Sequence, residues 1–431
     1  MLDESLLDSP EALARADSHG LLRSAAEAGA RVREAVRRST EAGLTELRPD
    51  GRPRAVLVAG PGPATACAAG LLGALGNGGM PVTLLRPSGP LAAPRALRWA
   101  LPGWAGPLDL LLVTTPDGTE PGLTALIEQA YRRGCTVVTV SPAASPAAEL
   151  TGETHGLAVP LARGSVAAWS SSAPDSGADE GDGQGGEPRD QPADAESDTS
   201  TEGESDTAAT QSAQHNQQQG TASSAASPDV LWSLLTPLLV LSDRLGLFPA
   251  GPPALQSLAD RLDHVAERCS PAVATYSNPA KSLATELSGV LPLLWSEGAV
   301  AGAVAQHTAI ALAAFPGVPA LAAGLPEAMS EHGALLSGAF AAASAPDDFF
   351  RDRVEEPESL HARVVLLREQ SPNGESAVVA VRDLAYAHDV PLSELQAAEG
   401  STPLEAAAEL IATADFAAVY LALADSGPSW S

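Results

Sequence analysis

Along the first 160 residues, continuous apolar runs alternate with segments in which apolar residues recur at helical spacing. The continuous apolar runs predict buried strands at 55–60, 82–85, 110–113 and 136–140. The helical spacing predicts helices over about 1–45, from the turn at 60–65 to about 76, and over 123–133. Strands that alternate with helices predict a doubly wound parallel α/β sheet, with ligands bound at the carboxyl ends of the strands.

The second half repeats this order. Its patterns predict helices at 230–246, 254–269, from about 300, and at 376–388, with strands at 291–295 and 362–367. Asn278 is the expected N-cap of a helix that has Pro279 in its first turn. Ser401-Thr402-Pro403 starts a last long helix. We therefore expect a second α/β domain, so that two doubly wound sheets with flanking helices make up the fold.

Between these halves, residues 170–228 change in composition. Ser, Asp, Glu, Gly and Gln dominate, and bulky apolar residues are absent from most of the segment. Such a sequence buries too little apolar surface to offset its ordering entropy, which predicts a disordered acidic linker. The predicted organisation is 1–169, 170–228 and 229–431. We expect the linker to be a spacer, and a protein partner bound through it is the alternative.

Charge and cysteine content narrow the function classes. The net charge of −28 argues against nucleic-acid binding, which needs a basic face. We expect the acidic start of the chain not to be a signal peptide, and the uncharged stretch 298–326 to be a buried helix and loop rather than a membrane span. Three separated cysteines match neither a zinc site nor a disulfide framework. We expect a cytoplasmic protein without metal or cofactor.

The only lysine of the chain, Lys281, lies in the most specific motif. Residues 278–292 fit the pattern N-x-A-K-x-L-A-x-x-L-x-G-x-x-P, and 414–423 read Ala-Asp-Phe-Ala-Ala-Val-Tyr-Leu-Ala-Leu. Together they resemble the bifunctional phosphoglucose/phosphomannose isomerases, whose C-terminal signature is G-D-Y-V-S-V-Y-L-A-L-L. The resemblance implies two sugar isomerase (SIS) domains, a hexose phosphate ligand and a homodimer. It also places Lys281 among the phosphosugar-binding residues.

The resemblance implies phosphate contacts at two turns, both altered here. The family's Gly-x-Gly-Gly-Ser corresponds to 60–64, so that Gly60 and Gly62 remain and Thr65 follows the lost serine. The family's Ser-Tyr-Ser-Gly-Asn-Thr-Glu-Glu corresponds to 114–121. The candidate residues there are Thr114, Thr115, Thr119 and Glu120. Asp117 adds a negative charge that disfavours phosphate unless a cation compensates.

The catalytic positions depart furthest from the family. The family's glutamate base falls on Ala309, and no Asp, Glu, Lys or Arg occurs between Glu297 and Glu327. Gln306 matches a family glutamine and is a candidate sugar contact. His332 lies two residues after the position that corresponds to the family's ring-opening histidine, and it is a candidate for that role. The family's C-terminal catalytic lysine has no counterpart.

Three hypotheses follow. The first is a phosphosugar-binding protein of hexose phosphate or mannose metabolism that has weakened or lost isomerase activity. The second is an active aldose–ketose isomerase that interconverts glucose 6-phosphate or mannose 6-phosphate with fructose 6-phosphate through replacement groups, His307, His332 or Glu286. The third is a non-catalytic interaction protein. Lost acid and base positions favour the first, because proton transfer by such groups contributes about 10²–10⁴-fold to a rate.

Overall fold

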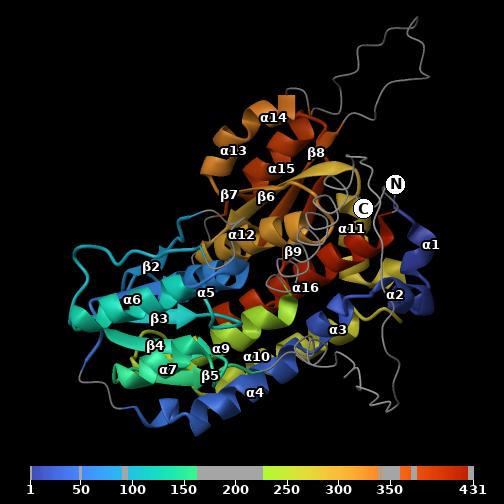
Figure 1. Ribbon diagram of the computed structural model, residues 1–431. Coiled ribbons are helices and arrows are strands. Elements are labelled where there is room, and N and C mark those ends of the chain that lie inside the picture. The colour runs from blue at the N-terminus through green and yellow to red at the C-terminus, as the bar shows by residue number, and fades with distance from the viewer. Residues whose placement is uncertain are drawn as a thin grey trace, which may run out of the picture.

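Two parallel β-sheets, each flanked by helices, make up the structure, which is a computed structural model (Figure 1). The two sheets confirm the predicted α/β fold with two doubly wound units. The structure describes residues 2–47, 51–89, 96–162, 227–337, 340, 360–369 and 376–425. The expected linker at 170–228 lies outside the described residues except for 227 and 228, and the predicted domain boundaries stay predictions.

The first sheet has five parallel strands in the order β2-β1-β3-β4-β5. Its strands are β1 (Ala55–Ala59), β2 (Val82–Leu85), β3 (Asp109–Thr114), β4 (Thr136–Ser141) and β5 (Leu157–Pro160). Its connecting helices are α5 (Gly62–Leu75), α6 (Pro121–Arg132) and α7 (Pro146–Glu153). All residues of β1 and β3 are buried, as expected for central strands that are covered on both faces.

The side chains of this sheet alternate between two cores. Val56, Val58 and Leu110 point to the side of α5, whereas Leu57 and Leu111 join the core that contains residues of α6. The helices α4 (Ala28–Glu41) and α9 (Pro228–Arg244) complete the α5 side: α9 packs on both α4 and α5, and α4 contacts β5. The helix α4, which lies within the predicted helical segment 1–45, therefore helps to cover this sheet.

The second sheet has four parallel strands in the order β7-β6-β8-β9. Its strands are β6 (Val290–Glu297), β7 (Leu321–Gly324), β8 (His361–Arg368) and β9 (Leu392–Gln396). Its helices are α11 (Pro279–Leu287), α12 (Ala299–Ala314), α13 (Glu327–Glu331), α14 (Gly333–Ser337), α15 (Val378–Ala387) and α16 (Pro403–Ala424). Asn278 caps α11 by accepting bonds from the amides of Ala280 and Lys281, as predicted.

This sheet also separates two cores. Leu293 and Trp295 of β6 belong to the core that contains Ala328 of α13 and Val381 of α15. Leu294 points the other way, into the large core that contains residues of α12 and α16. Any side chain can therefore be assigned to one face of the sheet by the core that it joins.

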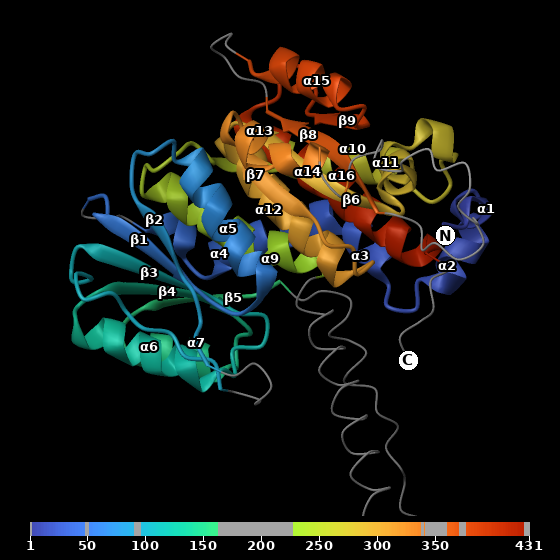
Figure 2. The same ribbon diagram turned by 90° about the horizontal axis from the view of Figure 1, so that it is seen from above.

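One continuous apolar core joins the two halves of the chain. The helix α12 packs on α5 of the first unit and on α16, and the same core includes buried residues of both sheets (Figure 2). The remaining elements around it are α1 (Glu4–Leu7), α2 (Pro10–Ala16), α3 (Leu21–Ala26), α10 (Pro252–Arg268) and the short 3-10 helices at Leu44–Glu46 and Thr275–Ser277. The two sheets are therefore parts of one packed body.

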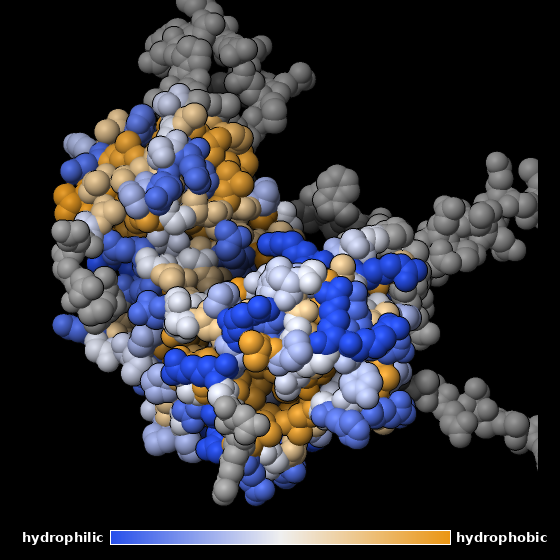
Figure 3. Space-filling model, turned by 90° about the vertical axis from the view of Figure 1, so that its left-hand side faces the viewer, coloured by the Kyte–Doolittle hydropathy of each residue, from blue (hydrophilic) through white to orange (hydrophobic). Residues whose placement is uncertain are grey.

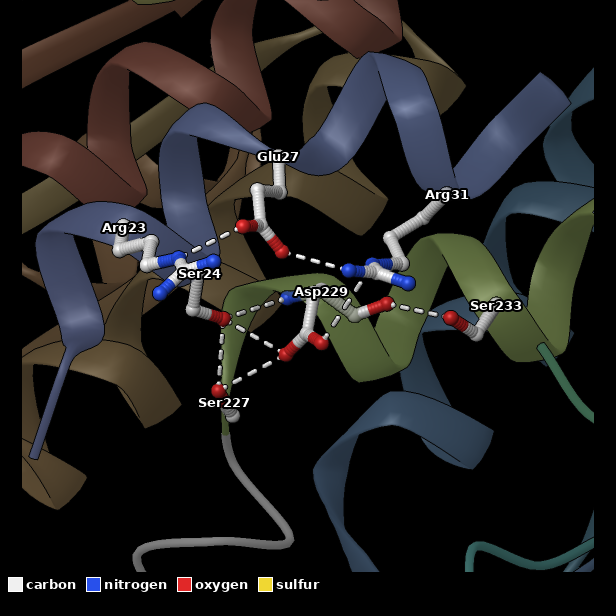
Figure 4. A network of polar contacts seen from close by, with 7 residues as sticks. All are labelled: Arg23, Ser24, Glu27, Arg31, Ser227, Asp229 and Ser233. Carbon is white, nitrogen blue, oxygen red and sulfur yellow. Dashed lines mark hydrogen bonds and ion pairs between the residues drawn. The ribbon is translucent and has the colours of Figure 1, made fainter. Parts of the chain in front are cut away.

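A buried polar network holds α9 where the described chain resumes at Ser227 (Figure 4). The carboxylate of Asp229 accepts hydrogen bonds from the hydroxyls of Ser24 (2.6 Å) and Ser227 (2.9 Å). Arg31 of α4 lies 4.0 Å from the other carboxylate oxygen of Asp229. These contacts fix the start of α9 against α3 and α4, because buried polar groups are stable only when they are paired.

The helix α16 is long and apolar enough to cross a membrane by length and composition, but 89% of its apolar window is buried in the protein. It packs on α10, α11 and α12. A capping box of Thr402 and Glu405 begins the helix. Its hydropathy is therefore that of a central core helix.

The apolar patterns predicted the central strands and most helices, and missed three strands. The elements β5, β7 and β9 are edge strands; β5 and β7 are short apolar runs of four residues, β9 alternates apolar and polar residues, and none of the three is buried along its whole length. Local patterns indicate strands that are covered on both faces, and these are not. The three cysteines are free and buried, as expected.

Candidate functional site

The candidate site lies at the carboxyl ends of β1 and β3. From β1 the chain passes to β2 on one side, and β3 pairs with β1 on the other side. Ligands of doubly wound folds bind at such a switch point. Gly60 follows β1, and Thr114 ends β3. We use the name first crevice for the two segments that follow these strand ends, residues 60–65 and 114–120.

The turn between β1 and α5 is shaped by close contacts. A Cβ atom at Gly60 would overlap the carbonyl oxygen of Thr114, so this position requires glycine. Gly62 has φ +79, which also favours glycine. The hydroxyls of Thr65 and Thr114 lie 2.8 Å apart, and both side chains are fully buried. These two threonines therefore bind each other across the turn.

The loop between β3 and α6 is organised around Asp117. Its carboxylate accepts hydrogen bonds from the Thr115 hydroxyl (3.1 Å), the Thr119 amide (3.1 Å) and the Thr119 hydroxyl (3.2 Å). The Gly118 amide donates to the Thr115 hydroxyl oxygen (2.9 Å). Both candidate threonines of this loop thus already bind an anionic group, and that group belongs to the chain.

The backbone of an arginine that was not predicted as a site residue, Arg98, lies beside the first turn of α6, which follows this loop. A Cβ atom at Gly122, in the first turn of α6, would lie 3.0 Å from the Cα atom of Arg98. Paired backbone hydrogen bonds with Ser88 (2.8 Å each) hold Arg98 there. Among the described residues, the exposed Arg98 guanidinium has no ion-pair partner. Sequence separation from the loop concealed this proximity, and the nearby Glu120 begins the same helix as its N-cap.

The helix α12 runs antiparallel to α5 and forms the neighbouring wall. Gly70 of α5 lies against Ala303, and Cys67 of α5 interacts with His307. Residues with higher numbers in α12 therefore contact residues with lower numbers in α5. The first turn of α5 therefore lies beside the C-terminal half of α12, which contains Ala309. His307 is the only titratable residue between 299 and 314.

His307 is bound within the core. Its Nε2 atom lies 2.7 Å from Oδ1 of Asp415 in α16, and only 7% of the residue is exposed. Burial lowers the pKa of His307, but the Asp415 carboxylate and Cys67 raise it by more, so that the pKa lies well above its usual value. Gln306, the adjacent candidate, is exposed and donates to the carbonyl oxygen of Ala322 (3.4 Å).

His332 lies on the other face of the second sheet. Its Nδ1 atom accepts a hydrogen bond from the Trp295 indole (2.9 Å), in the core opposite to that of α12. Burial lowers the pKa of His332, which favours the neutral ring. The structure therefore does not bring His332 and His307 together.

The other two candidates lie on α11. Glu286 accepts a hydrogen bond from Ser393 and pairs with Arg363 (3.3 Å), near the amino ends of β8 and β9. Lys281 is fully buried, and its ammonium donates to the carbonyl oxygens of Pro271 (2.8 Å) and Val273 (2.7 Å). These contacts give Lys281 a structural role in holding the segment before α11.

The corresponding ends of β6 and β8, residues 297–300 and 368–369, are named the second crevice. Glu369 accepts a hydrogen bond from the amide of Val300 (3.2 Å), at the N-terminus of α12. A Cβ atom at Gly298 would overlap the Glu369 carboxylate. Burial raises the pKa of Glu369. Here too a carboxylate of the chain occupies donors at the site expected for a ligand, and the sequence analysis did not consider it.

Other cavities and clusters do not compete with these crevices. Among the described residues, no group of three His, Cys, Asp or Glu side chains is arranged to hold a metal ion. A mainly apolar pocket is lined by residues such as Val56, Val82 and Leu110, near the amino ends of the first sheet. The face in Figure 3 mixes hydrophilic and hydrophobic residues. Strand topology therefore remains the best guide to the site.

The comparisons agree with this architecture. Among the solved structures that share the fold are the C-terminal domain of glucosamine-fructose-6-phosphate aminotransferase from Francisella tularensis and tagatose-6-phosphate ketose/aldose isomerase from Escherichia coli. The first has a TM-score of 0.53 at 9% identity, covering 94% of this chain and 96% of that one. The second has a TM-score of 0.50 at 11% identity, covering 94% and 91%. No curated protein matches the sequence.

A family model extends this likeness to sequence. The bacterial phospho-glucose isomerase C-terminal SIS domain matches residues 276–426, which contain both motifs on which the resemblance was based. That region begins just before the cap of α11 and includes the whole second sheet. Residues 276–426 therefore match the bacterial phospho-glucose isomerase C-terminal SIS domain, and this part of the chain supports its relationship to the SIS sugar isomerases.

Proposed function

We propose that this protein binds a hexose phosphate in the first crevice and does not interconvert aldose and ketose. Support for binding comes from the SIS fold, from the loop that holds an anion through Thr115 and Thr119, and from the nearby Arg98. Hydroxyls, backbone amides and a guanidinium are the groups that bind phosphate in proteins. The proposed place of the protein is therefore in hexose phosphate metabolism.

The proposed absence of isomerase activity is based on the residues of α12 that form the neighbouring wall. Isomerisation requires a group that moves a proton between C1 and C2 of the sugar. The half of α12 beside the first turn of α5 offers Ala309 and Ile310, and its single titratable group, His307, is paired with Asp415 in the core. Without a base at this wall, the crevice is suited to binding alone.

We expect no turnover of fructose 6-phosphate. Proton NMR of this sugar in D₂O with purified protein should show neither glucose nor mannose 6-phosphate signals, nor exchange at C1, over hours. An established phosphoglucose isomerase under the same conditions is the positive control. Signals that grow in proportion to the concentration of this protein would overturn the non-catalytic proposal. If such turnover disappeared in His332→Ala, that residue would be restored to the site.

Arg98 supplies a separate test of binding. Arg98→Ala should weaken glucose 6-phosphate binding by about tenfold, because a hydrogen bond to a charged group contributes about 1.5–3 kcal/mol. Isothermal titration calorimetry measures the change. Arg132→Ala is the matched control, since Arg132 is exposed at the opposite end of α6. Equal affinities of both variants and the wild type would remove Arg98 from the site.

A further inference from the structure

The first crevice contains an occupant from the chain itself. The Asp117 carboxylate accepts three hydrogen bonds, two of them from hydroxyls and one from the amide of Thr119. It lies between Thr115, the residue after β3, and the start of α6. A phosphate that enters this loop meets donors that already have an anionic acceptor.

Asp117 also adds a like charge. Two anionic groups about 4 Å apart repel each other, and the repulsion is about four times stronger near a protein surface than in bulk water. A bound phosphate monoester therefore either displaces the carboxylate or tolerates its repulsion. Both Asp117 and Thr119 are exposed, so the carboxylate can leave the loop without unfolding the buried parts, Thr115 and Gly118.

The neighbouring residues keep the loop in place when this carboxylate moves. A Cβ atom at Gly118 would overlap Ser145, the N-cap of α7, and Gly118 has φ +68. The Gly118 amide bonds the Thr115 hydroxyl rather than Asp117. The Thr115 amide donates to the carbonyl of Val140 in β4 (3.0 Å). The backbone of the loop is thus held independently of the Asp117 side chain.

We propose that Asp117 is an internal competitor for phosphate and the main determinant of which ligands the first crevice accepts. This inference rests on the proposed function, since it concerns affinity at the same crevice. The carboxylate lowers the affinity of the crevice for any phosphate. Inorganic phosphate is then bound more weakly than a hexose phosphate, because it has no sugar contacts to offset this loss. Removing its charge frees the Thr115 and Thr119 donors for a ligand and abolishes the repulsion.

The test compares Asp117→Asn with the wild type. Asparagine keeps one oxygen that can accept from the Thr119 amide, so it removes the charge with little change of shape. Asp117→Ser is the second variant, in case the amide side chain still occupies the loop. Asp383→Asn on α15 is the matched control, because Asp383 is exposed and its replacement changes the net charge equally. Melting temperatures verify that each variant is folded.

Calorimetric titrations with glucose 6-phosphate, fructose 6-phosphate, inorganic phosphate and glucose give the readout. At least one Asp117 variant should bind the sugar phosphates about tenfold more tightly than the wild type and Asp383→Asn do. Inorganic phosphate should gain affinity by a similar or larger factor, and glucose should gain none.

The outcomes separate the inference from the proposed function. If the wild type and all variants bind a hexose phosphate equally, the competitor role of Asp117 is wrong while the binding function stands. If neither the wild type nor either Asp117 variant binds a phosphate ligand at 10 mM, on the order of the weakest useful affinities, both proposals are overturned. A gain for glucose as well as for phosphate would contradict the charge mechanism.

Discussion

Asp415→Ala should destabilise the protein by about 3–5 kcal/mol, because removing one partner of a buried ion pair leaves the other charge uncompensated. Asp415 and His307 are 2% and 7% exposed, and their side chains are 2.7 Å apart. The pair joins α12 to α16, and His307 also interacts with Cys67 of α5. Urea unfolding measures the change.

The double variant His307→Leu/Asp415→Leu should be more stable than either single replacement by leucine, since apolar residues need no partner at this position. Asp383→Asn serves as the control, because Asp383 is exposed. Single variants within about 0.5 kcal/mol of the wild type, the range of ordinary surface substitutions, would contradict a stabilising role for the pair.

The same pair predicts a pH dependence. The pKa of His307 in the folded protein is raised above its unfolded value of about 6.5. Its contribution is therefore fully present below about pH 6.5 and is lost as the pH rises through the folded-state pKa. The difference in unfolding free energy between wild type and His307→Ala should be larger at pH 6 than at pH 9. A difference that grows with pH would show that the histidine is neutral in the folded state.

Lys281→Ala should cost about 2–5 kcal/mol of unfolding free energy, the usual range for truncating a long buried side chain. The side chain is fully buried, its ammonium binds two backbone carbonyls, and it lies 5.5 Å from the ring centre of Tyr420. Truncation leaves both a cavity and the carbonyls of Pro271 and Val273 without their donor. Chemical denaturation measures the loss.

Lys281→Met separates packing from hydrogen bonding. It keeps most of the volume and removes the ammonium, so we expect a smaller loss than for alanine, about 1–3 kcal/mol for the unpaired carbonyls. Arg132→Ala is the control for an exposed cation. If Lys281→Met folds as stably as the wild type but loses hexose phosphate affinity, Lys281 is a ligand-binding residue, as the family resemblance implied.

The candidate site shows where sequence reasoning reached its limit. The motif around Lys281 identified the family correctly, but a motif does not reveal whether its lysine faces a ligand or a backbone carbonyl. The absence of acids and bases along α12 is a property of the sequence itself. Of the two charged groups near the first crevice, the sequence indicated only Asp117, which lies in the loop itself. Arg98 was not predicted, because it reaches α6 from a distant segment.

His307 and His332 illustrate the same limit. Both were candidates because histidine often transfers protons, yet each has a partner from another element: Asp415 for one and Trp295 for the other. The side of a sheet on which a residue lies depends on register and on the cores that the helices form. No local pattern specifies these long-range pairings.

By itself, the sequence determined the α/β class, the central strands, the cap of α11 and the family of residues 276–426, because these depend on local periodicity, cap chemistry and motif spacing. Only the tertiary structure decided the edge strands, the shared core between the sheets, and the partners of Lys281, His307 and His332. It also placed Arg98 beside α6. These depend on contacts between residues far apart in the chain, whose closure is driven by burial of apolar surface rather than by local preference.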